Sequence, residues 1–385
     1  MFRKQIKQII NKASTNSYET LNSVELSKSR LLRNVDYFKK KHANQVLIPV
    51  LKANAYGHGL VQIAEMLNDT DCGYLAVDGY FEAAKIRDVT KHPILVLGYI
   101  KPSNIKLLDT KKCSFVVQDI DGLRALSLLN RPVKVHIELN TGMNRLGLQP
   151  EELVGYLKLL KNSKYLHLDG VMSHLADADN NSNEYTNQQV KLFDKLVEQI
   201  LRDGFTPKYI HIAQTAGSTK AKSKFANTVR IGIGLYGVNP LNQKDKHFED
   251  LSALSPVLEL KSTIIKVIGL HAGDRVSYNG IFTAPKEMRI GVLPLGYYEG
   301  IPRELSNKGI MTSGKIEFPI VGRVCMNHTI IDLKTSDLRV GDKVTVISSN
   351  PSNPNSIEQI CESNNLFNYS LMTGISESTR RVIVP

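Results

Sequence analysis

Eight short apolar runs, separated by segments of helical length and pattern, restrict the fold of this 385-residue chain more than any other feature. Such alternation is typical of a parallel β/α fold. Eight units are the number that closes a barrel, so we predict an α/β fold with an N-terminal (β/α)8 barrel of the TIM type. The runs are 45–51, 73–77, 93–97, 114–117, 133–139, 168–173, 209–213 and 229–233.

The pattern of apolar residues changes after Pro256. Before it, residues 184–202 place apolar side chains on one face of a predicted amphipathic helix, with Gly204 as its C-cap. After it come short β-rich runs at 258–268, 288–294, 316–324 and 343–348. We therefore predict three parts, namely a basic extension at 1–18, a barrel domain at 19–257 and a C-terminal, mostly β domain at 258–385.

Composition excludes several classes of protein. Four cysteines lie far apart without a CxxC pair, so we expect neither a metal site nor disulfides, and a reducing cytoplasm fits best. No apolar stretch approaches the roughly 20 residues that span a bilayer. The net charge of +12 favours anionic small molecules over nucleic acid, because no nucleic-acid-binding module accompanies it.

Lys52 closes the first apolar run and opens a glycine-punctuated loop that ends at Gly59. A lysine that ends a strand most often extends its ammonium into water. At the lip of a buried strand, however, desolvation can free the neutral amine as a nucleophile. The rich hydrogen-bonding loop that follows favours this second interpretation and suggests a Schiff-base lysine.

Reactive groups collect where the strands of a β/α barrel end. Glycine at 232 and 234 lets backbone N–H groups approach an anion, and we expect Thr215 to begin a helix whose N-terminus also favours phosphate. Taken singly, each such residue has an ordinary structural role, as a packing glycine, a loop histidine or a surface cation. The residues at the strand ends are Lys52, Arg145, His174, Gln214, Thr215, Arg230, Gly232 and Gly234.

These motifs resemble those of alanine racemase, a fold-type III family that depends on pyridoxal 5'-phosphate. The resemblance covers roughly residues 20–385. It is found in VLKANAYGHG at 50–59, NTGMNRLG at 140–147, VRIGIGLYG at 229–237, GRVCMN at 322–327 and LMTGIS at 371–376.

The resemblance implies that Lys52 binds the cofactor as a Schiff base. Tyr56, Thr215, Gly232 and Ile233 match positions around its phosphate. His174 would face the pyridine ring, and Arg230 would donate to the ring nitrogen. An arginine does not readily release its proton, so that nitrogen would stay unprotonated.

Racemisation needs a base on each face of the substrate. Lys52 supplies one, and the resemblance implies that Tyr278 of a partner subunit supplies the other, with His211 beside it as the group that activates it. A homodimer with shared active sites would then be required. The substrate residues implied are Arg145 and Met326, and Tyr297 and Arg303 match the substrate entrance.

Several positions depart from the family pattern. Glu138 stands where many relatives have a lysine whose carbamate lies beside the arginine matched by Arg145, and a glutamate could supply that charge directly. Asn327 replaces an acid, Gln214 an asparagine and Glu377 a tyrosine. We expect alanine as the substrate and D-alanine for cell-wall precursors as the product.

Two alternatives stay open on sequence alone, and the long β domain argues against a third. A serine or broad-specificity racemase is one, because a hydrophobic pocket rejects an added hydroxyl only weakly. A fold-type III decarboxylase is another, although it normally relies on a cysteine and an acid from the partner chain. A non-catalytic pyridoxal-phosphate carrier would share the barrel but lacks the long β domain after Pro256.

Overall fold

The computed structural model describes residues 19–385, and the predicted extension at 1–18 lies outside them. The described chain forms two compact units. One comprises Ser27–Val257, and the other combines Leu258–Val384 with the described residues up to Leu26. Each unit has its own sheets and its own buried apolar side chains.

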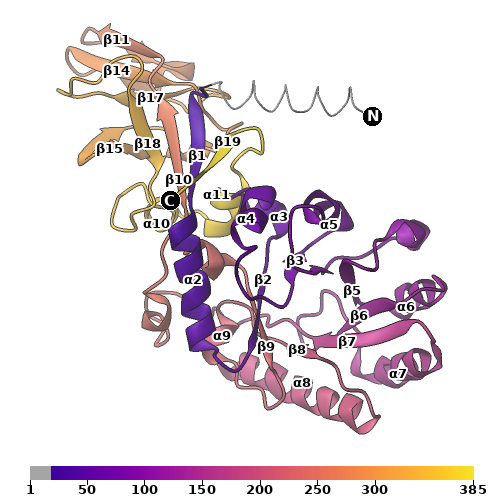
Figure 1. Cartoon of the computed structure of the whole chain (residues 1–385). Helices are drawn as coiled ribbons and strands as arrows, with labels where there is room; N and C mark the ends of the chain where they lie inside the picture. The colour runs from indigo at the N-terminus through magenta and orange to yellow at the C-terminus, as the bar shows by residue number, and fades with distance from the viewer. Residues whose placement is uncertain (1–18) are drawn as a thin grey trace, which may run out of the picture. The chain divides into compact units, whose positions relative to one another are not determined.

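The first unit is built on eight parallel strands (Figure 1). Six form one sheet in chain order, β3 to β8, and the other two, β2 and β9, pair with each other. A bond from Leu51 N to Ala76 O (2.7 Å) joins the β2 side to β3, and one from Arg230 N to Ala213 O (3.1 Å) joins β9 to the β8 side. The predicted N-terminal β/α barrel is confirmed. Its strands are β2 (Val46–Pro49), β3 (Leu75–Val77), β4 (Ile94–Val96), β5 (Cys113–Val117), β6 (Val133–Glu138), β7 (Leu166–Met172), β8 (Tyr209–His211) and β9 (Thr228–Ile231).

Helices surround these strands (Figure 1). The longest, α8 (Glu184–Arg202), has the predicted bounds and buries Val190, Phe193 and Ile200, which share one face at helical spacing. At α2 (Lys28–Lys41) the side chain of Ser27 caps the first turn, and lysines end the last turn, where cations are favourable. The others are α3 (Lys52–Tyr56), α4 (Leu60–Met66), α5 (Tyr80–Ile86), η1 (Pro102–Leu107), α6 (Ile120–Ser127), η2 (Pro150–Glu152), α7 (Leu153–Asn162), α9 (Gly217–Lys220), η3 (Ile233–Tyr236) and η4 (Glu249–Leu251).

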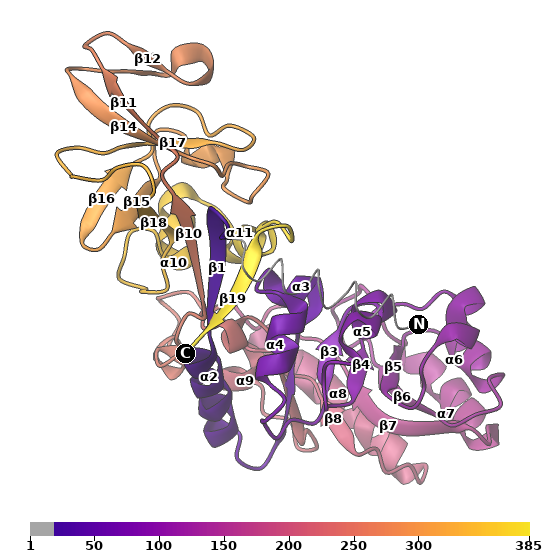
Figure 2. The same cartoon turned by 45° about the horizontal axis from the view of Figure 1, so that its top comes forward.

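The second unit is mostly β, as predicted. A six-stranded sheet has the order β16-β15-β18-β10-β1-β19, so the N-terminal strand β1 (Asn22–Ser27) lies next to β10 (Leu258–Thr263) (Figure 2). Val24 and Leu26 of β1 are fully buried and pair with Leu260 and Leu258. The remaining strands are β11 (Lys266–Leu270), β12 (Arg275–Val276), β13 (Phe282–Thr283), β14 (Met288–Leu293), β15 (Ile310–Ser313), β16 (Ile316–Pro319), β17 (Thr329–Asp332), β18 (Lys343–Ile347) and β19 (Arg380–Val384).

Helical segments interrupt this unit where the sequence pattern did not predict them. α10 (Ile357–Asn364) begins at Ser356, whose side chain accepts from Gln359 N at 3.2 Å, and α11 (Asn368–Thr373) follows closely. The short helical turns are η5 (Tyr278–Gly280) and η6 (Arg303–Leu305). The predicted run at 316–324 is also shorter than expected, because β16 ends at Pro319.

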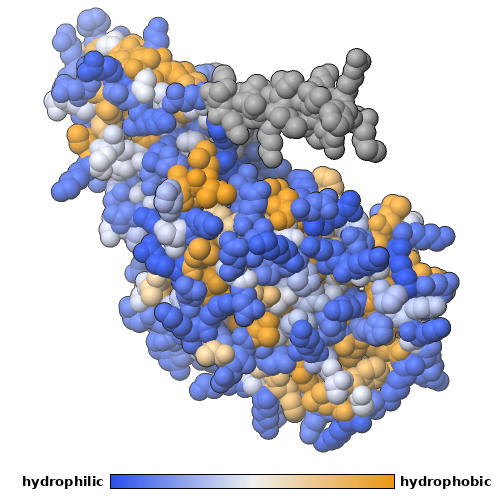
Figure 3. All heavy atoms as spheres, viewed as in Figure 1, coloured by the Kyte–Doolittle hydropathy of each residue, from blue (hydrophilic) through white to orange (hydrophobic). Residues whose placement is uncertain are grey.

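The surface of each unit is largely polar on the face shown in Figure 3, with smaller apolar areas between the polar side chains. Among residues 19–385, no helix is both long and apolar enough to cross a membrane. The same part of the chain contains no group of three or more histidine, cysteine, aspartate or glutamate side chains arranged to bind a metal ion.

Candidate active site

A left-handed turn follows β2 and begins at Lys52. The four residues 53–56 have φ values of 55°, 53°, 54° and 52°, although none is glycine. Left-handed backbone costs roughly 1–2 kcal/mol per residue and persists only where its surroundings fix it. Asn54 fixes it here, since its side chain accepts from Leu60 N at 2.8 Å and its N–H donates to Glu82 Oε1 at 3.3 Å. Partly buried Lys52 is thus attached to a constrained backbone.

Arg230 is a cation inside the barrel, only 2% exposed, on β9. Its Nη1 donates to His211 Nδ1 at 2.6 Å, and its Nη2 donates to the carbonyl of Ser173 at 2.7 Å. Burial lowers the pKa of Arg230 to about 10, so it remains charged at neutral pH. Its hydrogen bonds to other described residues all come from Nη1 and Nη2, which leaves Nε–H as the remaining donor.

Two fully buried histidines continue from this arginine. His211 Nε2 lies 3.0 Å from His136 Nδ1. Burial, together with the charge of Arg230, lowers the pKa of both imidazoles, so both are neutral at pH 7. Arg230 and His136 therefore occupy both ring nitrogens of His211. The expectation that His211 activates Tyr278 by direct contact does not agree with this arrangement.

His174 and Glu138 lie close to the same cations. His174 Nδ1 is 3.3 Å from Arg230 Nη2. Burial and the charges of Arg230, Arg145 and Lys52 lower the pKa of His174 to about 3. Burial raises the pKa of Glu138, while Arg230 and Arg145 oppose that rise. Lys52 and Arg145, which come from different strand ends, thus act electrostatically on the same pair of residues.

Tyr56, Thr215, Gly232 and Ile233 form a cradle at the end of β9. A Cβ added to Gly232 would lie 2.4 Å from the hydroxyl of Tyr56, so only glycine fits there without displacing the tyrosine. Gly234 N donates to Thr215 Oγ1 at 3.2 Å, which joins two loops. Ile233 begins the η3 turn, whose first N–H groups are not used within the turn.

The short helix α9 differs from the prediction, because it begins at Gly217 and not at Thr215. Residues 215 and 216 form a turn before the helix, and Gln214 Oε1 accepts from Gly217 N at 2.8 Å across this turn. Thr215 therefore lies before the helix, where its side chain contacts Gly234.

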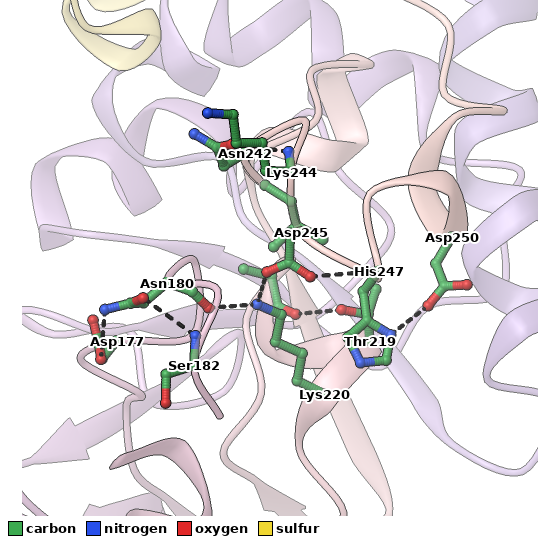
Figure 4. Close-up of polar contacts among 12 residues, drawn as sticks. Asp177, Asn180, Ser182, Thr219, Lys220, Asn242, Lys244, Asp245, His247 and Asp250 are labelled. Carbon is green, nitrogen blue, oxygen red and sulfur yellow. Dashed lines mark hydrogen bonds and ion pairs between the residues drawn. The ribbon is translucent and has the colours of Figure 1, made fainter. Parts of the chain in front are cut away.

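A buried ion pair anchors the other end of α9 (Figure 4). The side chains of Lys220 and Asp245 are both 0% exposed and form an ion pair, and Lys220 also donates to the carbonyl of Asn180 at 2.7 Å. Burial alone would raise the pKa of Asp245, but the hydrogen bond and charge of Lys220 and the N–H of His247 lower it. Two loops are thereby tied to the segment that carries Thr215.

Four predicted residues lie in the second unit. Tyr278 is 67% exposed on η5, between Ser277 and Asn279, whose φ values are 63° and 62°. Ser277 Oγ donates to Arg323 O at 2.8 Å and holds one side of this turn. Tyr297 and Met326 are 46% and 54% exposed, and Arg303 is also exposed.

The altered residue Asn327 has a partner in this unit. Its Nδ2 donates to Glu299 Oε1 at 2.8 Å, and Gly296 N donates to Glu299 Oε2 at 2.7 Å. Backbone bonds from Tyr297 N to Cys325 O and from Tyr298 N to Met326 O, both 3.0 Å, join the same loops. The amide of Asn327 thus takes part in holding Met326 beside Tyr297.

Glu377, which stands where the family has a tyrosine, lies near Arg381. Arg381 donates to the carbonyls of Thr379 at 2.6 Å and Ile375 at 3.2 Å. Burial lowers the pKa of Arg381, and the charge of Glu377 opposes that shift. Glu377 therefore has a cationic neighbour.

The structure brings ten predicted residues together in the barrel unit by hydrogen bonds, close contacts or electrostatic interaction, namely Lys52, Tyr56, Glu138, Arg145, His174, His211, Thr215, Arg230, Gly232 and Ile233. Sequence reasoning missed His136 and Lys220. A histidine within the apolar strand β6 was a signal for the first. Nothing in the pattern marked Lys220, whose partner Asp245 is distant along the chain.

Comparisons with known proteins agree with this arrangement. Residues 26–240 match the alanine racemase N-terminal domain family, and residues 257–383 match the alanine racemase C-terminal domain family. An alanine racemase of Francisella philomiragia is 30% identical over 370 residues, which cover 94% of this chain and 100% of that protein. One of Staphylococcus saprophyticus is 31% identical over 366 residues, covering 93% and 94%.

Solved structures show the same fold. Alanine racemase of Clostridium difficile 630 has a TM-score of 0.88 at 27% identity, covering 96% of this chain and 97% of that one. The Bacillus anthracis enzyme with bound L-Ala-P gives 0.86 at 28% identity, with 96% of each chain covered. The Bartonella henselae enzyme with covalently bound pyridoxal phosphate shares the fold, with a TM-score of 0.82 at 23% identity over 95% of this chain and 100% of that one. This chain is an isomerase that belongs to the alanine racemase family.

Proposed function

We propose that this chain interconverts L- and D-alanine with pyridoxal 5'-phosphate. The alanine racemase family depends on this cofactor, and the Bartonella henselae relative is described with it covalently bound. The observation that carries the proposal is the state of Arg230, a buried cation with one N–H donor left over and neutral histidines beside it.

The barrel residues fit the cofactor. The remaining Nε–H of Arg230 suits the pyridine nitrogen as an acceptor, and an arginine with a pKa of about 10 keeps its own proton at neutral pH. The cradle of Tyr56, Thr215, Gly232 and Ile233 suits the phosphate, because Gly232 lets an anion approach the backbone. When bound, the cofactor supplies a conjugated ring that withdraws electrons from the substrate's α-carbon.

The chain's own residues would move the protons. Lys52 would bind the cofactor and exchange the α-proton on one face through its amine. Tyr278 of a partner subunit would exchange it on the opposite face through its phenolic oxygen. His174, which is neutral and beside Arg230, replaces His211 as the imidazole that can assist that tyrosine.

We propose roles for the other predicted residues on the same basis. Glu138 supplies the negative charge beside Arg145, and Arg145 with Met326 orients the substrate carboxylate. Tyr297 and Arg303 line the substrate entrance. The predicted domain at 19–257 would then bind the cofactor, and the predicted domain at 258–385 would supply the second base. We expect a cytoplasmic homodimer that supplies D-alanine for cell-wall precursors.

The test is a D/L-resolved assay of the purified, cofactor-loaded protein with L-alanine, L-serine and L-lysine in separate reactions. D-alanine formed faster than D-serine supports the proposal, and Lys52→Ala and Tyr278→Phe should both abolish it. Equal catalytic efficiencies for alanine and serine would indicate a broader racemase. Carbon dioxide released from lysine without racemisation would indicate a decarboxylase.

A further inference from the structure

A line of polar side chains, buried except for the partly buried Asp169 at its end, leads away from Arg230 through the barrel. It runs from Arg230 on β9 to His211 on β8, to His136 on β6 and to Asp169 on β7. The first two contacts are hydrogen bonds of 2.6 and 3.0 Å. His136 Nε2 then lies 3.8 Å from Asp169 Oδ2, which exceeds a hydrogen-bond length but is within ion-pair range.

The direction of this line is fixed by hydrogen-bond chemistry. Arginine can only donate, so His211 Nδ1 must accept from it. A neutral imidazole that accepts at Nδ1 carries its proton on Nε2, and it donates that proton to His136 Nδ1. By the same rule the proton of His136 lies on Nε2, the nitrogen that faces Asp169. One arrangement of protons therefore satisfies both hydrogen bonds and places the N–H of His136 toward Asp169.

Asp169 ends the line as an anion with partners of its own. Tyr74 donates to its Oδ2 at 2.5 Å, and the Tyr74 hydroxyl is 2.7 Å from Ser114 Oγ. Burial would raise the pKa of Asp169, but His136, Tyr74 and Lys134 together lower it. This lowered pKa keeps Asp169 negatively charged at neutral pH. Its side chain is 13% exposed and lies 3.8 Å from the fully buried imidazole of His136.

The ring of His136 has little freedom to turn away from Asp169. A Cβ on Gly170 would lie 2.3 Å from His136 Nδ1, so the ring packs against the backbone of β7 where only glycine fits. On another side the ring of Tyr209 stacks on it, with centroids 5.9 Å apart and planes at 18°. The contacts of His136 thus restrict its ring position, while Asp169 favours a proton on Nε2.

We propose that Asp169 is a positioning residue for the reaction, whose carboxylate stabilises the tautomers that Arg230 imposes on His211 and His136 and thereby holds Arg230 with its free donor toward the cofactor. Without that charge, His136 can carry its proton on Nδ1, where it would oppose the N–H of His211. Either the two donors would separate, or His211 would carry its own proton on Nδ1 and oppose the N–H of Arg230 across the 2.6 Å contact. This inference rests on the proposed function only for the part that concerns the cofactor.

The first test does not require activity. Long-range ¹H–¹⁵N NMR of the full-length apoprotein with labelled histidine reports which nitrogen of each imidazole carries the proton, with signals assigned by His136→Asn and His211→Asn. We expect His136 and His211 to be protonated on Nε2, and Asp169→Asn to introduce the Nδ1-protonated form of His136. A wild-type His211 protonated on Nδ1, or unchanged tautomers in D169N, would overturn the inference.

The second test uses the loaded enzyme and a matched control. Ser114→Ala removes a buried hydrogen bond from the same cluster but leaves Asp169 and His136 in place. We expect D169N to lower kcat for alanine about tenfold with little change in KM, to weaken cofactor affinity, and to be partly rescued as D169E, whereas S114A stays near wild type. Equal kcat values for D169N and S114A would contradict a positioning role. If wild type fails to racemise alanine, the proposed function fails, while the NMR result still decides the tautomer selection.

Discussion

The substitution Gly232→Ala adds one methyl group to the phosphate cradle and so tests whether the cradle binds the cofactor. We expect Gly232→Ala to weaken cofactor affinity about tenfold or more, because the added Cβ would meet the Tyr56 hydroxyl at 2.4 Å. Titration of the apoprotein, followed by cofactor absorbance, measures this. Gly155→Ala is the matched control, since nothing lies within 4 Å of its Cβ. Equal affinities in the two variants would show that the cradle does not hold the cofactor.

Glu138 tests whether a glutamate supplies the charge beside Arg145. We expect Glu138→Gln to lower kcat/KM for alanine about tenfold, because Arg145 and Arg230 would lose a shared counter-charge. Since burial raises the pKa of Glu138, the wild-type enzyme should lose this contribution at a higher pH than an ordinary glutamate would, and E138Q should lack that acid limb. The pH profile of both proteins measures the effect. Glu65→Gln, at an exposed carboxylate, is the control. Unchanged turnover and cofactor affinity in E138Q would show that Glu138 does not supply a needed charge beside Arg145.

At the scale of single residues, sequence reasoning found those that end strands. Lys52, His174 and Arg230 follow or lie in apolar runs, and the barrel brings such positions together. It could not find Asp169, because an acid in a strand is visible in the sequence but its partner is not. For His211 it identified the position and not the role, since both contacts of the ring come from other strands.

The element α9 depends on its buried anchor, and the anchor has a defined pH dependence. The pKa of Asp245 lies below its ordinary value of 3.8 in the folded chain, so the folded state binds fewer protons than the unfolded state in that range. Its contribution to stability is therefore complete above the ordinary pKa and is lost as pH falls through the folded pKa. We expect Asp245→Asn to flatten this acid loss in thermal unfolding curves recorded across acidic pH.

At neutral pH the same variant should be strongly destabilised. Asp245→Asn leaves the Lys220 ammonium buried without a counter-charge, which typically costs about 3–5 kcal/mol. Adding Lys220→Met removes the stranded charge and should restore part of the stability. Identical acid slopes in wild type and D245N, or a double variant no more stable than D245N, would contradict this account of the ion pair.

At the scale of elements, the barrel strands were predictable and the β unit was less so. Strands buried on both faces are continuous apolar runs, and each of the eight predicted runs overlaps a strand. α10 was missed because its apolar residues Ile357, Ile360 and Cys361 occupy only two turns, too few for a periodic pattern. The addition of β1 to the distant β10 could not be predicted, because local pattern does not specify a strand's partner.

The whole molecule is the scale at which the second base must be tested, because Lys52 and Tyr278 belong to separate units of the chain. We expect Lys52→Ala and Tyr278→Phe homodimers each to be inactive. Mixing them under conditions that exchange subunits should restore activity, because each mixed dimer has one site with an intact Lys52 and an intact Tyr278. Random exchange gives half mixed dimers with one good site of two, or about a quarter of wild-type activity.

The pattern of recovery distinguishes where the tyrosine comes from. If Tyr278 served the Lys52 of its own chain, every site in the mixed dimers would lack one of the two bases, and exchange would restore nothing. Exchange itself can be verified by mass difference on a tagged subunit, so that failure to mix is not mistaken for failure to complement. Tyr298→Phe, paired with Lys52→Ala, is the matched control: Tyr298 is exposed in the same unit, 58% against 67% for Tyr278, and its variant homodimer should be active before mixing. An active Tyr278→Phe homodimer would instead show that another group serves as the second base.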